Sequence, residues 1–353
     1  MATSNWSGCS TAIGRDGSLA VDLAFFGLQV PPFNPAPDPR FLYLTPAHQE
    51  ALAQMLYGVQ QQKGFMLLTG EIGTGKTTLL KALMERLGET TAVAFVTNSM
   101  LDFDGILEYV LEDLGIAKPG QSTLAQRLVA LQNFLIERQR TGQNTVLIVD
   151  EAHDLSPKTL EQIRLLSNFE TMSDKILQIV FAGQPELRAK LDLPELRQLK
   201  QRIGLRCRIP ALASKDVGDY IRTRLRVAGA RDLGLFSREA IALVGAYSGG
   251  IPRVVNIVCD HCLVSAYADQ VRRIGPRTVE EAISYLEDGE RRRGKGRDLL
   301  GRLRMTPLRW ALVAATAVAA GTVALTATHP ATAERAVDFG SNLVHAVRAL
   351  LPL

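Results

Sequence analysis

Cysteine, net charge and internal repeats are all scarce in this chain of 353 residues. The four cysteines, Cys9, Cys207, Cys259 and Cys262, are too few and too scattered for a disulfide scaffold. The formal net charge is only +4, and it comes largely from residues 291–309, so an evenly basic nucleic-acid-binding surface is not indicated. We find no internal repeat, which argues against a repeat architecture.

Two apparent signals in the sequence have ordinary explanations. The segment "CDHC" resembles half of a zinc or redox site, but no second pair completes it, and its flanks have helical apolar spacing. We therefore expect Cys259 and Cys262 to be small buried helix residues in a reducing, cytosolic setting. Residues 1–23 have no basic start and no apolar core, so we expect a flexible arm rather than a signal peptide.

The fold class follows from short apolar runs that alternate with helical patterns. We predict strands at "GFMLLTG", "TAVAFVTN", "NTVLIVD" and "KILQIVFAG", each apolar along its whole length. Such strands, separated by helices, indicate an α/β domain with a parallel sheet covered on both faces, here over residues 24–204. From about Leu205 to residue 288, four helical segments follow one another, which predicts a small all-α lid domain.

A nucleotide-binding loop is predicted at "GEIGTGKT", which matches G-x-x-x-x-G-K-[ST] in full and lies between a predicted strand and helix. Its glycines let backbone N–H groups surround phosphates, and the helix N-terminus adds positive charge. We expect Lys76 to reach the β- and γ-phosphates and Thr77 to offer its hydroxyl to Mg²⁺. The alternative, a chance glycine-rich loop, is disfavoured by this context. The predicted binding residues are Gly70, Glu71, Ile72, Gly73, Thr74, Gly75, Lys76, Thr77 and Thr78.

Two acidic residues follow the strand "TVLIV" at its carboxyl end, where open α/β sheets bind their ligands. Asp150 is suited to hold Mg²⁺, and Glu151 is suited to orient or deprotonate an attacking water. The alternative is an acidic pair that simply ends a buried strand. For His153 we favour a local structural role over chemistry.

Four further polar residues are candidates for sensing the nucleotide. Gln184 follows the next strand and is suited to touch the γ-phosphate, although it could instead cap a helix. Arg202, or alternatively Arg197, is a candidate arginine finger for the γ-phosphate of a neighbouring subunit, whereas ordinary solvated arginines are the other interpretation. Arg253 begins a lid helix and is suited to fold over the phosphates, unless it is a plain surface residue.

These motifs, with "LIVDEAHDLSPKTLEQIRLLSNFET" and "GQPELRAKLDLPELRQLKQRI", together resemble the ExeA-type AAA+ ATPases, the general secretion pathway protein A family. The family includes relatives from exopolysaccharide and exosortase-associated loci. The resemblance covers roughly residues 24–288 and implies a nucleotide-binding domain with a helical lid, Mg·ATP as ligand, and a ring-shaped homo-oligomer. It also implies the roles given above for the motif residues and suggests that the segment around Phe33 packs near the adenine.

The chain ends with a pattern typical of a membrane anchor. A basic linker at 289–309 is followed by nineteen uncharged residues at 310–328, for which we predict a transmembrane helix. The positive-inside rule then places the ATPase in the cytoplasm of a bacterial inner membrane. Residues 329–353 become a short periplasmic tail, with the spacing of an amphipathic helix. A soluble alanine-rich helix is the alternative for 310–328.

The leading hypothesis is an inner-membrane-anchored AAA+ ATPase that drives assembly or operation of an envelope secretion or polysaccharide export machine. Its expected partners are copies of itself, secretion or export proteins and inner-membrane lipid, and nucleic acid is not expected. Family members commonly continue into a periplasmic peptidoglycan-binding domain, whereas only 25 residues follow Thr328 here. Two alternatives remain open: a DNA-associated AAA+ ATPase of the transposition-helper type, and a nucleotide-gated scaffold with little turnover.

Overall fold

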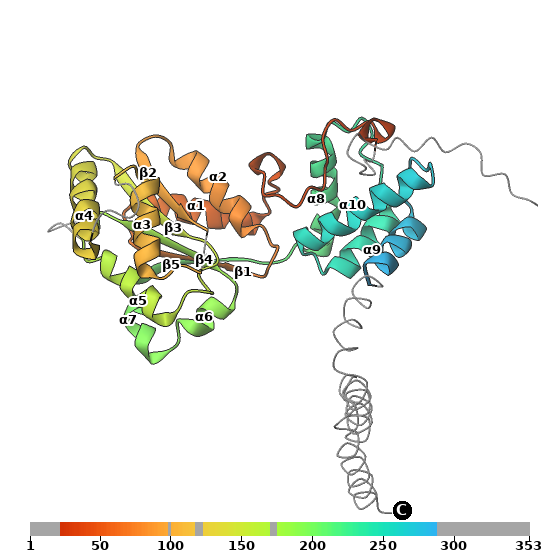
Figure 1. Cartoon of the computed structure of the whole chain (residues 1–353). Coiled ribbons are helices and arrows are strands. Elements are labelled where there is room, and N and C mark those ends of the chain that lie inside the picture. Colours follow the sequence, from red (N-terminus) through yellow and green to blue (C-terminus); the bar gives the residue numbers. More distant parts are fainter. Residues whose placement is uncertain (1–21, 98–99, 117–122, 170–174, 288–353) are drawn as a thin grey trace, which may run out of the picture. The chain divides into compact units, whose positions relative to one another are not determined.

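The computed structural model describes the ordered elements drawn in colour in Figure 1. The chain divides into two compact units, Met1–Ser284 and Tyr285–Leu353, and only 285–287 of the second unit are described. The predicted α/β part, and the predicted helical part as far as Ser284, lie in the first unit. The described residues are 22–97, 100–116, 123–169 and 175–287.

Five parallel strands form one sheet in the order β2-β3-β4-β1-β5. This order places β1, which leads into the phosphate-binding loop, between two neighbours, with β3 and its acidic pair one strand further along. The parallel sheet of the predicted fold class is confirmed. The strands are β1 (Phe65–Gly70), β2 (Thr91–Val96), β3 (Asn144–Val149), β4 (Gln178–Gly183) and β5 (Ile203–Ile209).

Helices occupy the connections between these strands and the part of the chain that surrounds the sheet. The α-helices of this part are α1 (Pro46–Gln60), α2 (Lys76–Leu87), α3 (Phe103–Asp113), α4 (Leu124–Arg140), α5 (Pro157–Leu166), α6 (Glu186–Lys190) and α7 (Arg197–Arg202). Three short 3-10 helices are η1 (Leu23–Phe26), η2 (Pro39–Phe41) and η3 (Pro194–Leu196).

The sheet is buried on both faces because successive strand residues point to opposite sides. On β1, Met66 and Leu68 belong to one hydrophobic cluster, while Phe65 and Leu67 belong to the other. Helices α1 and α2 close the first cluster, and α3, α4, α5 and α7 close the second, as Figure 1 also shows. This alternation explains why the strands read as continuous apolar runs.

Strand β5 lies where the sequence prediction placed the boundary between the two parts, so the sheet continues past residue 204 to Ile209. It is the edge strand beside β1, with Arg206 and Arg208 exposed and Cys207 and Ile209 buried. An edge strand that is covered on one side has this alternating pattern rather than a continuous apolar run, and this is why it was missed.

Beyond β5 the regular structure of the described residues is mainly helical, and a separate lid domain stays a prediction. Helices α8 (Ser214–Val227), α9 (Arg238–Ser248) and α10 (Pro252–Ala268) are followed by a helix over residues 276–287. Cys259 and Cys262 are buried in α10, and burial raises the pKa of Cys262 to about 12. The interpretation of this pair as small core residues is confirmed.

Several predictions concern residues outside the described ranges. They are most of the N-terminal arm, the basic linker, the span at 310–328 and the tail at 329–353. Within the described ranges, none of the helices combines the length and the apolar character needed to cross a bilayer. The prediction of a transmembrane helix at 310–328 therefore stays a prediction.

Candidate functional site

The phosphate-binding loop has the backbone that its glycines allow. It runs from the end of β1 to the start of α2 at Lys76, and Gly73 and Gly75 have φ values of +78° and +98°. These angles lie in the left-handed region, which residues with a Cβ rarely adopt. A Cβ on Gly73 would also lie 2.5 Å from the Cβ of Arg253, so the loop and the start of α10 are in close contact.

Lys76 lies within the loop with 4% of its surface exposed. Its Nζ donates to the carbonyl oxygens of Gly70 (3.0 Å) and Glu71 (3.1 Å). Burial lowers the pKa of Lys76, and the nearby carboxylates of Glu151 and Asp150 act in the opposite direction. A cation held in this way is suited to bind the terminal phosphates of a nucleotide.

Thr77 and Asp150 meet at the mouth of the loop. The hydroxyl of Thr77 donates to Oδ2 of Asp150 at 2.6 Å, and Oδ1 of the same carboxylate accepts from the backbone N–H of Glu151 at 2.9 Å. Two neighbouring hard oxygen ligands fit Mg²⁺, which takes few protein ligands and completes its shell with phosphate and water oxygens. The described residues contain no group of three or more His, Cys, Asp or Glu side chains that could enclose a metal.

Glu151 adopts a strained backbone conformation beside the loop. Its φ is +49°, which is uncommon for a residue with a side chain and costs roughly 1 kcal/mol. Its Oε2 is buried and lies 3.3 Å from Nδ1 of His153. Glu151 also lines the cavity described next, which places a carboxylate where a general base is needed.

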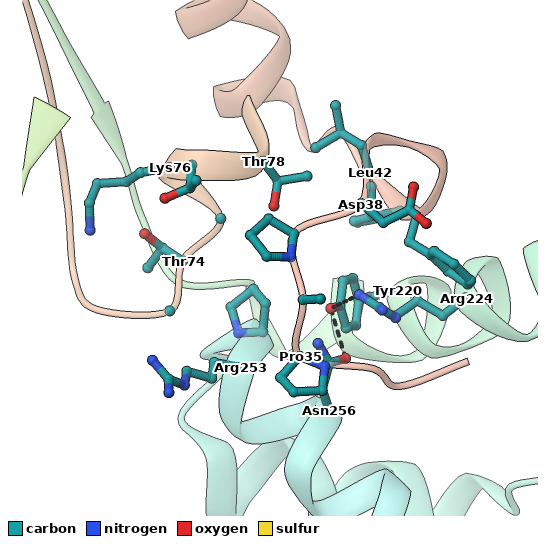
Figure 2. A pocket seen from close by; sticks show the side chains of 18 of the residues that line it. Pro35, Asp38, Leu42, Thr74, Lys76, Thr78, Tyr220, Arg224, Arg253 and Asn256 are labelled. Atoms are coloured by element: carbon teal, nitrogen blue, oxygen red, sulfur yellow. Dashed lines mark hydrogen bonds between the residues drawn. The ribbon is translucent and has the colours of Figure 1, made fainter. Parts of the chain in front are cut away.

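A cavity of about 340 Å³ opens between the loop and helices α8 and α10. Its volume is in the range of small-molecule and cofactor sites. Figure 2 shows Thr74, Lys76 and Thr78 on the loop side and Tyr220, Arg224 and Asn256 on the helical side. The lining residues predicted from the phosphate-binding motif are Ile72, Gly73, Thr74, Gly75, Lys76, Thr77 and Thr78.

The helical wall of the cavity contains residues that sequence reasoning missed. Arg224 is buried, and it donates to the carbonyl oxygens of Pro32 (Nε, 2.5 Å) and Asn34 (Nη2, 3.1 Å) and to the hydroxyl of Tyr220 (Nη1, 3.0 Å). Tyr220 in turn donates to Oδ1 of Asn256 at 2.9 Å. No local motif marks these residues, because the network joins segments about 190 positions apart in sequence.

His48 supports the loop from α1 and was also missed. Its Nε2 lies 3.3 Å from the carbonyl oxygen of Thr74, and its Nδ1 lies 2.6 Å from the hydroxyl of Thr45, the N-cap of the helix. Burial lowers the pKa of His48, which favours a neutral ring. A cap residue at Thr45 can be read from the sequence, but such a pattern gives no sign of the contact with the loop.

The predicted sensing residues lie in different places. Arg253 is exposed and lines the cavity, and its backbone N–H donates to the carbonyl oxygen of Gly73 at 3.2 Å. Gln184 does not line the cavity and contacts His153, with 2.7 Å between Nε2 of each side chain. Arg202 lies away from the cavity, where its Nη1 donates to Ser167 (2.6 Å) and Asn168 (2.9 Å).

Two other candidates also lie outside the cavity wall. Arg197 is an exposed residue at the start of α7. Phe33 is 1% exposed and packs edge-on against Phe236, with ring centroids 5.9 Å apart. The residues that follow Phe33 line the cavity in its place. They are Asn34, Pro35, Ala36, Pro37, Asp38, Phe41, Leu42 and Tyr43.

Comparisons with known proteins identify an AAA domain in this part of the chain. Residues 59–191 match the family described as an AAA domain. The chain is 41% identical to general secretion pathway protein A of Aeromonas hydrophila over 244 residues, which are 69% of this chain and 44% of that protein. The chain therefore spans less than half the length of this relative. The predicted resemblance and the prediction of an ATPase domain are confirmed.

Solved structures show the same fold at low identity. Cdc6p from Pyrobaculum aerophilum superposes with a TM-score of 0.56 and 18% identity over 71% of this chain and 69% of that chain. The ORC1 protein of Aeropyrum pernix, solved in complex with DNA, gives 0.54 and 17% over 70% and 67%. At these identities the likeness shows the architecture alone, an α/β P-loop core with flanking helices.

Proposed function

We propose that this chain, an AAA-domain protein similar to general secretion pathway protein A, hydrolyses Mg·ATP and uses the cycle to drive a cell-envelope secretion or export machine. The observation that carries the nucleotide part is the 2.6 Å hydrogen bond between Thr77 and Asp150. It brings the hydroxyl of the phosphate-binding loop and the carboxylate after β3 together beside the cavity. This is the pair of oxygen ligands that a magnesium-bound triphosphate requires.

The residues of the site divide the chemistry between them. Thr77 and Asp150 would hold Mg²⁺, which when bound would neutralise the charge of the phosphates. Lys76 and the backbone N–H groups of the loop bind the phosphate oxygens. Glu151 accepts a proton from the attacking water, and Gln184 reports the presence of the terminal phosphate.

The base and sugar of the nucleotide occupy the outer part of the cavity in this proposal. Residues from the segment before α1 form one wall there, and Tyr220 and Arg224 from α8 form the other. Since Arg224 ties these two segments together through Pro32 and Asn34, nucleotide binding and the position of α8 are linked. The adenine therefore lies beside the neighbours of Phe33 rather than against its ring.

Arg202 acts in this proposal on the site of a neighbouring copy. Its contacts with Ser167 and Asn168, at the end of α5, hold the guanidinium outside its own cavity. An arginine placed there completes a site only when a second chain faces it, as arginine fingers do. The functional unit is therefore a homo-oligomer.

Magnesium-dependent binding of ATP tests the nucleotide site. We expect Mg²⁺ to tighten the binding of a fluorescent ATP analogue to the wild-type chain about tenfold or more, and Asp150→Asn to remove this gain while binding without Mg²⁺ persists. Asp192→Asn is the control, because Asp192 is an exposed carboxylate paired with Lys200. An undiminished effect of Mg²⁺ in Asp150→Asn would contradict the proposed site.

The membrane part of the proposal rests on the uncharged segment at 310–328 and the basic residues before it, together with the similarity to a secretion pathway protein. Retention of the full chain in the membrane fraction through an alkaline carbonate wash, and its loss on truncation before Arg291, is the expected result. Release of the full chain by the wash would refute the anchor. The nucleotide site would be unaffected by that outcome.

A further inference from the structure

Glu151 and Gln184 are connected through a single side chain, His153, in the loop after β3. On one side of the imidazole, Nδ1 lies 3.3 Å from Oε2 of Glu151. On the other side, Nε2 lies 2.7 Å from Nε2 of Gln184. The His153 side chain is only 13% exposed. Two residues that the proposed function assigns to different tasks are therefore joined by one ring.

The partners on the two sides of the ring determine where its proton lies. A lone pair on Nδ1 facing the Glu151 carboxylate would be repelled, whereas an N–H there is attracted. Oδ1 of Asp154 lies 3.5 Å from Nε2, but the amide nitrogen of Gln184 is closer, at 2.7 Å, and can only donate, so we place the proton on Nδ1. Nε2 is then an acceptor and takes a hydrogen bond from the amide N–H of Gln184. Oε2 of Glu151 and Nδ1 of His153 are both buried and form no hydrogen bond among the described residues, so the 3.3 Å contact between them is an electrostatic one.

The loop that carries His153 is fixed to the segment that carries Gln184. The backbone N–H of Ala152 donates to the carbonyl oxygen of Ala182 at 2.8 Å. Lys190, in α6, donates through Nζ to the carbonyl oxygens of His153 and, at 2.8 Å, of Leu155. These contacts hold the backbone of His153 between the residues that carry Glu151 and Gln184.

We propose that His153 is a positioning residue that aligns the Glu151 carboxylate for proton abstraction and makes this alignment depend on Gln184. The proposal rests on the proposed function. Oε2 of Glu151 is directed at His153, which leaves Oε1 to accept the proton of the attacking water. The Gln184 amide has a second N–H, which is available to a terminal phosphate while the first is bonded to His153. The same side chain then contacts the phosphate and holds the base in place.

Two conservative substitutions separate the two sides of the ring. Asparagine at 153 places an amide near the position of Nδ1 and so keeps the group that faces Glu151, and glutamine places one near Nε2 and keeps the group that faces Gln184. His153→Leu keeps bulk without either polar contact. We expect His153→Leu to lower kcat for ATP about 10- to 100-fold, as when the partner that orients a catalytic group is removed, with KM and nucleotide affinity changed less than threefold.

The rescue pattern is the readout that a purely structural role would not produce. We expect His153→Asn to recover at least a third of the lost kcat and His153→Gln to recover less, since contact with Glu151 is the one that matters for the chemical step. Asp192→Asn, which changes an exposed carboxylate paired with Lys200 and away from the ring, is the control and should stay within twofold of wild type. Thermal unfolding of each variant shows whether folding is retained.

A double-mutant cycle tests the dependence on Gln184. If the ring transmits the effect, Gln184→Ala should lower kcat much less in the His153→Leu background than in the wild type. Multiplicative effects of the two changes, or a kcat for folded His153→Leu within twofold of wild type, would overturn the proposal. If either of those results is found and Glu151→Gln still abolishes hydrolysis, only the role of His153 is wrong and the proposed function stands. Unchanged hydrolysis in Glu151→Gln would remove the proposed function itself.

Discussion

At the scale of single residues, the phosphate-binding loop depends on Gly73. Alanine there would have to adopt a left-handed φ of +78° and would place its Cβ 2.5 Å from that of Arg253. The backbone cost is about 1 kcal/mol, and the clash adds to it. We expect Gly73→Ala to weaken nucleotide binding at least tenfold, because the loop must move away from α10, and titration with a fluorescent ATP analogue measures this.

Gly88 provides the matched control for this change. It has a φ of +69°, and a Cβ there would meet nothing within 4 Å. Gly88→Ala therefore carries the backbone cost without the clash, and should lower stability by about 1 kcal/mol while nucleotide affinity stays the same. Equal losses of affinity in both variants would mean that contact with the start of α10 is irrelevant to the site.

His48 predicts a dependence of stability on pH. Because burial lowers its pKa below the ordinary 6.5, the unfolded chain binds a proton more tightly than the folded chain. Stability is therefore highest above pH 6.5 and falls as the pH decreases below it, by at most about 1.4 kcal/mol per pH unit from this group. We expect His48→Asn to reduce this slope. Urea unfolding of both proteins between pH 7.5 and 5.5 measures it, and identical slopes would disprove the assignment.

The motif residues of the site could be predicted because their chemistry is encoded locally. Lys76, Thr77, Asp150 and Glu151 each sit in a short pattern at the end of a strand, and all four are gathered at the loop. Arg224 sits in no such pattern, because its partners are carbonyl oxygens of another segment, and any residue can supply those. Sequence spacing thus identifies the phosphate end of the site but not the wall contributed by α8.

At the scale of elements, Arg224 is the contact that joins α8 to the chain before α1. It is buried, makes three hydrogen bonds and lies 4.7 Å from the ring centroid of Phe41. Removing a buried cation that satisfies two carbonyls should lower the free energy of unfolding by about 3 kcal/mol and also weaken nucleotide binding. Arg224→Ala tests this by urea unfolding and ATP titration.

Arg222 is the control on the same helix. Its side chain is 42% exposed and forms a surface ion pair with Asp219, so Arg222→Ala should change stability by less than about 0.5 kcal/mol. A loss in Arg224→Ala no larger than this would show that α8 is held in place by apolar packing alone.

The elements themselves were predictable to different degrees. Buried strands such as β3 are apolar throughout, and helix α2 begins directly at the phosphate-binding motif, so these were found. Strand β5 was missed because its exposed face carries arginines. Long-range pairing with β1, rather than local composition, makes it a strand.

At the scale of the whole molecule, a finger arginine that acts between copies predicts complementation. Lys76→Ala removes phosphate binding from its own site, and Arg202→Ala removes the finger from its neighbour's site. Each variant alone should be nearly inactive, whereas an equimolar mixture should recover about a quarter of the wild-type rate, since one interface in four then pairs an intact loop with an intact arginine.

In the control, Arg197→Ala takes the place of Arg202→Ala, both alone and in the mixture with Lys76→Ala. If Arg202 is the finger, Arg197→Ala is active on its own. Failure of the first mixture to exceed the sum of its components, when the variants are shown to co-assemble, would contradict a role for Arg202 between subunits.

The most direct test of the account is the rate of phosphate release from ATP by the full chain and by its Glu151→Gln variant, measured together with bound nucleotide. The account predicts Mg²⁺-dependent release by the wild type, a fall of about 100-fold or more in Glu151→Gln, and retention of uncleaved ATP by the variant. Release by Glu151→Gln within twofold of wild type would contradict it.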